Sequence, residues 1–411
     1  MSESVVIVGA GHAAGQAAIS LRQGGWQGSI SIVGEEPYPP YQRPPLSKKF
    51  LAGELPLERL YLRPETFYAE HDIDLRLGSR ITAIDREAHR LTLGDGGELA
   101  YDKLILATGS RVRRLALPGG ELTGVHYLRN IDDVLALQEG FEPGARLVII
   151  GAGYIGLEVA AVAVKSGLVV TVLEAADRVM GRVVSPEVSA FYQREHTRAG
   201  VRLRLETPPG TRIGGEGRVS SVIEGDGREH RAELVLIGIG VLPVTELAEA
   251  AGLDCDNGIV VDEYCRTADP DILAIGDCTN HPNALLGRRL RLESVHNAQE
   301  QAKTAARTLL GRLEPYADVP WFWSDQYDLK LQIAGLGDPG CRRVIRGEPG
   351  ERSFAVFHCG DDGRLVAVEA INSPREFMLG RKLIAAGARL DPAELADSGN
   401  DFKALAETAL G

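Results

Sequence analysis

The chain has 411 residues, of which 44% are hydrophobic and 25% are charged, as in ordinary globular proteins. Its formal net charge of −12 argues against a general nucleic-acid binder, because such proteins present a basic surface. No stretch reaches the roughly 20 apolar residues of a membrane span, and the N-terminus does not have the pattern of a signal peptide. We therefore expect a soluble, cytoplasmic protein of about two to four domains.

The N-terminal segment has the pattern of a nucleotide-binding β-turn-α-β unit. Strands are expected at 5–8 and 29–33, with a helix at 12–23 that follows Gly9-Ala10-Gly11-His12-Ala13-Ala14. The first glycine permits the tight turn, the second lets a pyrophosphate approach the backbone, and the last alanine lets the helix pack closely. Glu35 stands where a carboxylate can bind ribose hydroxyls. We assign this unit to FAD, with contacts from Gly9, Gly11, Ala13, Ala14 and Glu35.

A second unit of the same kind starts near residue 147. Strands are expected at 147–150 and 169–173, around a helix at 154–166 that opens with Gly151-Ala152-Gly153-Tyr154-Ile155-Gly156. Glu174 ends the second strand, where a carboxylate favours a ribose 2′-hydroxyl and repels a 2′-phosphate, so we predict NADH rather than NADPH. Arg178 could weaken that preference. The predicted NAD contacts are Gly151, Gly153, Tyr154, Ile155, Gly156, Glu174 and Gly238.

The rest of the chain predicts further strands and a distinct C-terminal part. A hairpin is expected near 81–93, a buried strand at 103–107, and a helix at 293–310. Other expected strands lie at 201–206, 219–224, 233–240, 272–276, 330–334, 352–358 and 365–369, and a last helix at 374–386. We predict an α/β protein with two Rossmann-like domains and a small C-terminal α+β domain. The FAD-binding domain would comprise residues 1–113 and 236–320, the NAD-binding domain residues 114–235, and the C-terminal domain residues 321–411.

Longer motifs narrow the class of protein. LILATGS (104–110) and ILAIGDC (272–278) resemble the two short motifs of glutathione-reductase-like flavoproteins. YQRPPLSK, YLRPETFY, YIGLEVAA, RLESVHNAQEQA and PWFWSDQYDLKLQIAG resemble the NADH-dependent ferredoxin reductases of bacterial oxygenase systems, over essentially the whole chain. This resemblance implies an FAD enzyme that takes hydride from NADH and passes single electrons to a [2Fe–2S] ferredoxin. That ferredoxin would supply an oxygenase of aromatic hydrocarbon catabolism. We expect a monomer or a weak homodimer.

The resemblance also implies roles for individual residues. Asp277 would hydrogen-bond the ribityl or pyrophosphate part of FAD, and Lys48 would lie beside the flavin and stabilise negative charge on the reduced ring. Glu158 would reach the nicotinamide, and Trp323 would shield the isoalloxazine. A solvated lysine, a surface glutamate and a core aromatic are the respective alternatives for Lys48, Glu158 and Trp323, which are our catalytic candidates. The other expected FAD contacts are Arg43, Ile81, Ala107, Thr108, Gly109, Arg129, Gly276 and Val295.

The distribution of cysteines decides how electrons leave the flavin. The five cysteines lie at positions 255, 265, 278, 341 and 359, with no C-x-x-C pair. Such a set predicts reduced thiols and no metal site. Because no cysteine precedes residue 255, a dithiol relay in the first domain is excluded. Ser47 and Lys48 stand where related enzymes carry a single cysteine. The iron–sulfur centre must therefore be on a partner.

An acidic ferredoxin would need a basic surface on this acidic chain. Candidate groups are Arg288, Arg289 and Arg291, or Arg342, Arg343 and Arg346, with scattered solvated charges as the alternative.

Two other functions stay open. The acceptor could differ, as in a rubredoxin reductase, a monodehydroascorbate reductase or an NADH oxidase. The chain could instead be a flavin redox sensor or scaffold like the apoptosis-inducing flavoproteins, although it lacks long disordered or basic tails.

Overall fold

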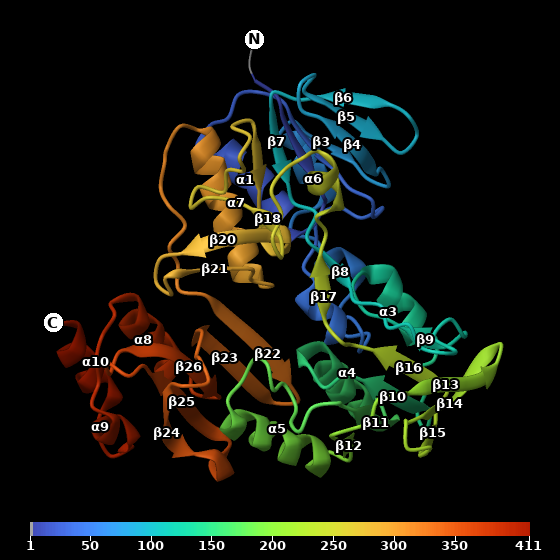
Figure 1. Ribbon diagram of the computed structural model, residues 1–411, viewed down its shortest axis with the longest axis vertical. Coiled ribbons are helices and arrows are strands. Elements are labelled where there is room, and N and C mark those ends of the chain that lie inside the picture. The colour runs from blue at the N-terminus through green and yellow to red at the C-terminus, as the bar shows by residue number, and fades with distance from the viewer. Residues whose placement is uncertain (1–2) are drawn as a thin grey trace. The chain divides into compact units, whose positions relative to one another are not determined.

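The computed structural model describes residues 3–411, which form two compact units (Figure 1). Among the described residues, unit 1 comprises 3–43, Pro56–Arg111 and Leu242–Pro320, and unit 2 comprises Pro44–Leu55, Val112–Val241 and Trp321–Gly411. The chain passes from one unit to the other within β8 (Ser110–Val112) and β17 (Val241–Pro243). The three-domain division at residues 113, 235 and 320 stays a prediction. Unit 2 contains both the predicted NAD-binding segment and the C-terminal segment.

Unit 1 is built on a parallel sheet with the strand order β19-β7-β1-β2-β3. Its central strand VVIV (residues 5–8) and the strand ILA (residues 272–274) are fully buried aliphatic runs, as expected when both faces of a parallel sheet are covered. The elements of unit 1 are β1 (Val5–Val8), α1 (His12–Gly24), β2 (Ile30–Val33), η2 (Leu57–Arg59), α2 (Glu65–Glu70), β3 (Ile73–Arg76), β4 (Ile81–Asp85), β5 (Arg90–Leu93), β6 (Glu98–Ala100), β7 (Lys103–Leu106), α6 (Glu246–Ala250), β18 (Ile259–Val260), β19 (Ile272–Ala274), η3 (Gly276–Cys278), β20 (Thr279–Asn283), β21 (Arg288–Leu290) and α7 (Val295–Leu309).

Helices α1 and α7 lie side by side on one face of this sheet (Figure 1). Alanines on both helices, such as Ala17 and Ala302, are fully buried at this contact, so the helix axes can approach closely. The other face packs against the antiparallel sheet β4–β5–β6 through residues such as Ile81 and Leu91. This arrangement leaves the turns at the carboxyl ends of β1 and β19 for the nucleotide motifs.

Unit 2 contains a second parallel sheet, with the order β12-β11-β10-β16-β9. The antiparallel sheet β13–β14–β15 covers one face of it, where Ile213 and Val222 meet Val148 and Ile150. The elements of this part are η1 (Pro44–Ser47), β9 (Val125–His126), α3 (Ile131–Gln138), β10 (Arg146–Ile150), α4 (Tyr154–Lys165), β11 (Val169–Leu173), α5 (Pro186–Arg198), β12 (Arg202–Arg204), β13 (Arg212–Glu216), β14 (Arg218–Ile223), β15 (Glu229–Arg231) and β16 (Leu234–Ile237).

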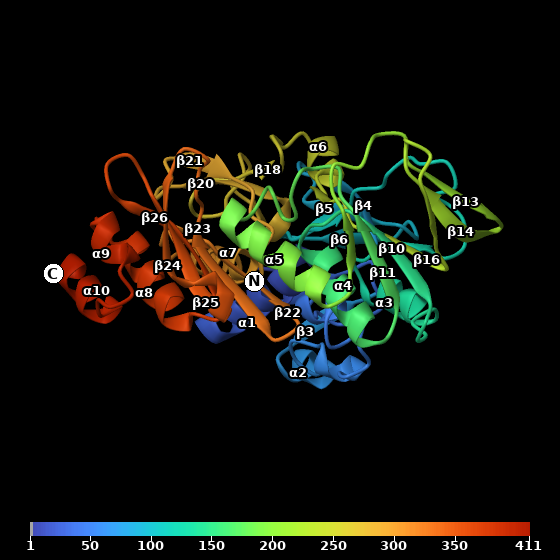
Figure 2. The same cartoon turned by 90° about the horizontal axis from the view of Figure 1, so that it is seen from below.

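The C-terminal part of unit 2 is an antiparallel sheet with the order β22-β23-β26-β25-β24. Helix α8 packs on β26, α9 contacts β24 and α10 contacts α8, all at the C-terminal end of the chain (Figure 2). These elements are β22 (Trp321–Gln326), β23 (Leu329–Gly335), β24 (Arg342–Glu348), η4 (Pro349–Glu351), β25 (Ser353–Cys359), β26 (Leu365–Ile371), α8 (Pro374–Ala385), α9 (Pro392–Ala396) and α10 (Phe402–Leu410).

The predicted fold class is confirmed: two parallel Rossmann-like sheets and a C-terminal α+β domain. The predicted strands and helices are present with ends within a few residues, whereas several other elements were not predicted, among them α3, α5, α9, α10, β3, β22 and β24. Among the residues that the structure describes, we find no helix with the length and hydrophobicity of a membrane span.

Candidate functional site

The first glycine motif forms the turn between β1 and α1. Gly9 has φ +109°, and a Cβ there would collide with the carbonyl oxygen of Ala107, so this turn requires glycine. A Cβ on Gly11 would meet nothing within 4 Å, which leaves room above the backbone at the start of the helix. Ala13 and Ala14 are buried against the sheet. The open space at Gly11 and the free N–H groups of the first turn fit a pyrophosphate.

His12, which sequence reasoning did not identify, adds a hydrogen-bond donor at this turn. Burial lowers the pKa of His12 to about 4, with Asp277 opposing, so the ring is neutral at neutral pH. Its Nε2 lies 3.0 Å from the amide nitrogen of Gln299 and accepts from it, so Nδ1 carries the proton. Within the described part of the chain, this buried Nδ1 has no hydrogen-bond partner. A buried orphan donor beside a helix N-terminus fits a phosphate oxygen.

The second flavin motif forms the turn after β19. Gly276 has φ +82°, and its N–H donates to Oε1 of Gln301 at 2.7 Å. The hydroxyl of Thr279 also donates to this oxygen, at 3.0 Å. Ser110 donates to Oδ2 of Asp277 at 2.8 Å. Gln301 is fully buried on α7 and orients the turn that presents Asp277, which is a role that the sequence pattern did not reveal.

The other predicted FAD residues of unit 1 lie at loop and strand ends. Glu35 is exposed and 3.2 Å from Arg80, and Thr108 donates to the carbonyl of Val244 at 2.7 Å. Arg43 forms an ion pair with Glu36 at 2.6 Å. Gly109 has φ +68°, Ile81 and Ala107 are buried, and Val295 is the first residue of α7. Their contacts with FAD stay predictions.

The second glycine motif repeats this geometry between β10 and α4. Gly151 has φ +105°, and a Cβ there would lie 2.5 Å from the carbonyl oxygen of Gly238. A Cβ on Gly156 would collide with the carbonyl of Gly151, whereas one on Gly153 would meet nothing within 4 Å. Gly238, which follows β16, therefore belongs to the same packed turn. Tyr154 begins α4 and is partly buried, and Ile155 is exposed.

Two charged side chains near this turn bear on the choice of nucleotide. The carboxylate of Glu174 accepts the N–H groups of Ala152 at 2.7 Å and Ala176 at 2.9 Å, so it is fixed at the turn. Arg178 donates to the carbonyl oxygens of Val184 at 2.8 Å and Gly181 at 2.6 Å. Its guanidinium is therefore engaged with the backbone.

Lys48 and Glu158 are brought together in unit 2. The Nζ of Lys48 lies 2.6 Å from Oε2 of Glu158, which is buried on α4. Ser47 donates to the same oxygen, and Ser324 donates to Oε1 at 2.6 Å. The alternatives of a solvated lysine and a surface glutamate are therefore wrong. Ser324 is a further member of this cluster that sequence reasoning missed, because it comes from the distant strand β22.

Two more predicted residues lie in unit 2. Trp323 is partly buried on β22, with its ring centroid 5.2 Å from that of Trp321. Arg129 precedes α3, and its backbone N–H donates to Oδ2 of Asp133 at 2.8 Å. Their roles toward FAD stay predictions.

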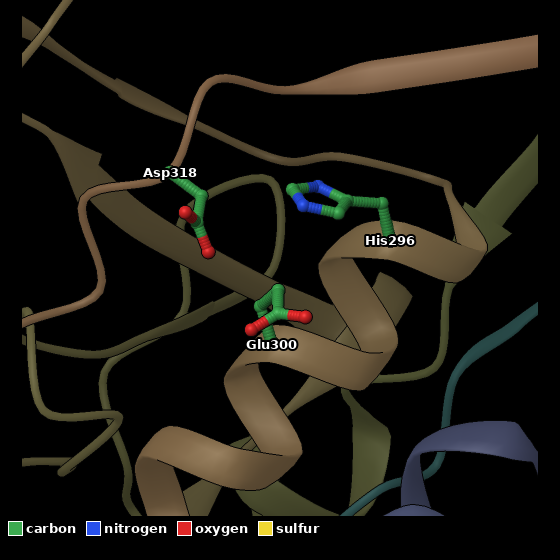
Figure 3. A group of neighbouring side chains, drawn as sticks. All are labelled: His296, Glu300 and Asp318. Carbon is green, nitrogen blue, oxygen red and sulfur yellow. The ribbon is translucent and has the colours of Figure 1, made fainter. Parts of the chain in front are cut away.

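One group of metal-ligand types occurs among the described residues. His296, Glu300 and Asp318 each offer a ligand atom within 4.8 Å of the others (Figure 3). The ammonium of Lys303 lies 2.7 Å from Oε1 of Glu300. Lys303 therefore compensates the charge of Glu300, which is one of the two carboxylates of the group.

Two arginines proposed for ferredoxin docking have internal roles. Arg346 is buried, and its guanidinium donates to the carbonyl oxygens of Leu395 at 3.1 Å, Asp397 at 2.7 Å and Asn400 at 2.6 Å. Arg289 donates to two backbone carbonyls at 2.5 and 2.6 Å. Both arginines stabilise the fold. Neither of the two predicted arginine groups can therefore serve as a docking surface with all three of its members.

The five cysteines are free, as predicted. Burial raises the pKa of the thiols of Cys265 and Cys278, so neither is a reactive thiolate.

Comparison with known proteins defines the class of this chain. Residues 3–302 match the family model "Pyridine nucleotide-disulphide oxidoreductase", and residues 321–406 match "Reductase C-terminal". The chain belongs to the pyridine nucleotide-disulphide oxidoreductase family.

Its relatives place it within that family. It is 46% identical to rhodocoxin reductase of Rhodococcus erythropolis, over 97% of this chain and 93% of the relative. It is 46% identical to the anthranilate 1,2-dioxygenase system ferredoxin–NAD(+) reductase component of Burkholderia cepacia, over 96% and 97%. Among solved structures, the covalent putidaredoxin reductase–putidaredoxin complex has a TM-score of 0.96 at 42% identity, covering 99% of both chains. The chain is thus a ferredoxin reductase of the kind found in bacterial oxygenase systems, as the sequence predicted.

Proposed function

We propose that this chain holds FAD and uses it to pass reducing equivalents from NADH to a [2Fe–2S] ferredoxin that supplies an oxygenase. The observation that carries the proposal is the pair of nucleotide turns, at Gly11 and Gly153, each with open space above the backbone at a helix start. The buried Nδ1–H of His12 supports a phosphate group at the first turn. Bound FAD supplies the conversion between a two-electron donor and one-electron acceptors.

We propose NADH as the preferred donor. The fixed carboxylate of Glu174 favours a ribose 2′-hydroxyl and repels a 2′-phosphate. Arg178, the nearest candidate for binding that phosphate, is engaged with backbone carbonyls. Both features support NADH.

Three residues of unit 2 are proposed to act at the reacting end of the nucleotides. Glu158 accepts a hydrogen bond from the nicotinamide carboxamide, and Lys48 stabilises that carboxylate and the negative charge of the reduced flavin. Trp323 excludes water from the ring. The nicotinamide carbon and the flavin must approach to roughly 3–3.5 Å for hydride transfer, which demands such positioning.

Electrons are proposed to leave the flavin directly to the ferredoxin. No cysteine precedes residue 255, and Ser47 contacts Glu158 where a thiol would otherwise stand. The Burkholderia cepacia relative is named as a ferredoxin–NAD(+) reductase of a dioxygenase system, and the similar solved structure contains putidaredoxin. A cytoplasmic location and a monomeric or weakly dimeric state remain part of the proposal.

Rubredoxin is the second candidate acceptor, because a rubredoxin–NAD(+) reductase of Pseudomonas putida is 41% identical over 90% of this chain. The test is to purify the protein, measure its flavin content, and compare turnover with NADH toward a [2Fe–2S] ferredoxin, rubredoxin, ascorbate radical and oxygen. We expect bound FAD and the highest kcat/KM with the ferredoxin. A colourless protein that NADH does not reduce after reconstitution with FAD would refute the proposal.

A further inference from the structure

A chain of buried polar side chains starts at Glu158 and ends at the surface of unit 2. Oε1 of Glu158 is 2.6 Å from Oγ of Ser324, which is 3.1 Å from Nε2 of Gln326. Oε1 of Gln326 is 2.8 Å from Nε2 of His196, and Nδ1 of His196 is 2.9 Å from the hydroxyl of Tyr327. Ser324, Gln326 and His196 are fully buried, whereas Tyr327 is 36% exposed.

The buried residues of this series come from α4, α5 and β22. Glu158 lies on α4 and His196 on α5, while Ser324 and Gln326 lie two residues apart on β22 and so face the same side of that strand. Trp323 faces the opposite side. Strand β22 therefore presents the Trp323 ring on one face and the side chains of Ser324 and Gln326 on the other.

In this series of side chains, each hydrogen bond is donated in the direction of the Glu158 carboxylate. Burial lowers the pKa of His196 to about 4, so its ring is neutral, with one donating and one accepting nitrogen. Burial raises the pKa of Tyr327, so its hydroxyl stays protonated and donates to Nδ1. Nε2–H of His196 then donates to the Gln326 carbonyl, the Gln326 amide donates to Ser324, and Ser324 donates to Glu158.

The reverse order would be unfavourable. If the Gln326 carbonyl faced Ser324, the hydroxyl would be drawn to it, and Oγ of Ser324 would face Oε1 of Glu158 at 2.6 Å without a shared proton. Aligned hydrogen bonds also polarise one another in a buried site, which strengthens the last bond of the series.

We propose that Ser324, Gln326 and His196 are positioning residues that fix the Glu158 carboxylate in one orientation for the nicotinamide. The amide of Gln326 interrupts any proton hopping, so the chain orients the carboxylate and does not conduct protons to it. The inference rests on the proposed role of Glu158. Ser47 and Lys48 occupy Oε2 and Ser324 occupies one site on Oε1, which leaves a site on Oε1 for the carboxamide N–H.

The test uses the FAD-loaded enzyme and anaerobic stopped-flow measurement of each half-reaction. In Ser324→Ala the carboxylate loses the donor to Oε1, and in His196→Phe the series loses its link between Tyr327 and Gln326. We expect the limiting rate of flavin reduction by NADH to fall about tenfold in both variants, because small displacements cost orders of magnitude in hydride transfer. The apparent Kd for NADH should change little, since the adenosine half of NADH binds elsewhere on unit 2.

Ser324→Thr keeps the hydroxyl and should restore the limiting rate. His358→Phe is the control, because it removes another buried histidine of unit 2. His358 contacts Glu369 at 3.1 Å and is not part of the hydrogen-bonded series, so the rate should stay within twofold of wild type. Tyr327→Phe removes only the hydroxyl that donates to His196 at the outer end of the series. This variant is the alternative if the buried variants fail to fold, and its expected decrease is smaller. Oxidation of the reduced enzyme by ferredoxin should stay unchanged in all variants.

The proposal is overturned if Ser324→Ala reduces its flavin at the wild-type rate, or if both half-reactions slow equally. Failure of the proposed function gives a different result, because the wild-type protein itself would then not be reduced by NADH.

Discussion

At the scale of single residues, the buried ion pair of Lys48 and Glu158 is the most consequential feature. Removing one partner of a buried pair leaves an uncompensated charge, which typically costs about 3–5 kcal/mol, whereas removing both costs less than the sum. We expect Glu158→Gln to lower both the rate of flavin reduction and the stability of the protein, and Lys48→Met to rescue part of that stability. Denaturant unfolding of the two single variants and the double variant measures the coupling.

The exposed ion pair of Lys165 and Glu54, at 2.8 Å in the same unit, is the matched control. Solvent screens such pairs, so its coupling should be much weaker. Equal coupling energies for the two pairs would contradict the argument.

Glu174 belongs to the same scale, because we propose that this one carboxylate sets the preference for NADH over NADPH. Glu174→Gln keeps the size of the side chain and removes the charge that repels a 2′-phosphate. We expect the ratio of kcat/KM for NADPH to that for NADH to rise about tenfold, which is about 1.4 kcal/mol. Asp177→Asn removes an exposed charge three residues further on and should not change the ratio. An unchanged ratio in Glu174→Gln would mean that another group excludes the 2′-phosphate.

At the scale of elements, the two strand–turn–helix motifs can be tested independently. An alanine at Gly11 or Gly153 meets no protein atom within 4 Å, so neither substitution should disturb the fold. The added methyl group would instead occupy the space proposed for a pyrophosphate. We expect Gly11→Ala to lose most of its FAD on purification while NADH binding survives. Gly153→Ala should keep FAD and bind NADH about tenfold more weakly or worse.

Flavin absorbance and a titration with NADH measure the two effects. Loss of FAD from both variants to the same degree would show that the turns do not act separately.

These elements also show what sequence reasoning can reach. Both glycine motifs and their strands are local patterns, so Gly9, Gly151 and the fold class were predictable from neighbouring residues. The cluster around Glu158 was not, because Ser324 and His196 come from β22 and α5, more than 30 residues away in sequence, and only packing brings them together. Helix α5 was missed because its pattern PEVSAFYQREHTR is polar overall and is stabilised by tertiary contacts.

The prediction that Arg346 belongs to a docking surface was wrong for a related reason. A cluster of arginines in the sequence is typical of a charged surface, but the guanidinium of Arg346 donates hydrogen bonds to three carbonyl oxygens near α9. Only the packing of the C-terminal helices shows this.

At the scale of the whole molecule, buried histidines predict how stability depends on pH. Burial lowers the pKa of His12, His196 and His281 to about 4, below the usual value of 6.5. Between these two pH values the unfolded chain binds more protons than the folded chain, so stability is lost as the pH falls through this window. For His196 the loss is at most about 3 kcal/mol.

We expect His196→Phe to flatten the dependence of the unfolding midpoint on pH between about 6.5 and 4, whatever its effect at pH 7. Thermal unfolding at a series of pH values measures the slope of the unfolding midpoint against pH. An unaltered slope in His196→Phe would show that the His196 ring protonates as readily in the folded protein as in the unfolded chain.

The way the chain alternates between the two units has a consequence for biosynthesis. The edge strand β19 of the first sheet is not made until residue 274, yet its partner β7 ends at residue 106. During synthesis on the ribosome, the edge of β7 therefore stays unpaired until the intervening residues have been made. At typical rates of synthesis this delay is on the order of tens of seconds. The nascent polypeptide is exposed to aggregation during that interval, and a gene truncated before β19 would encode a product that cannot complete its first parallel sheet.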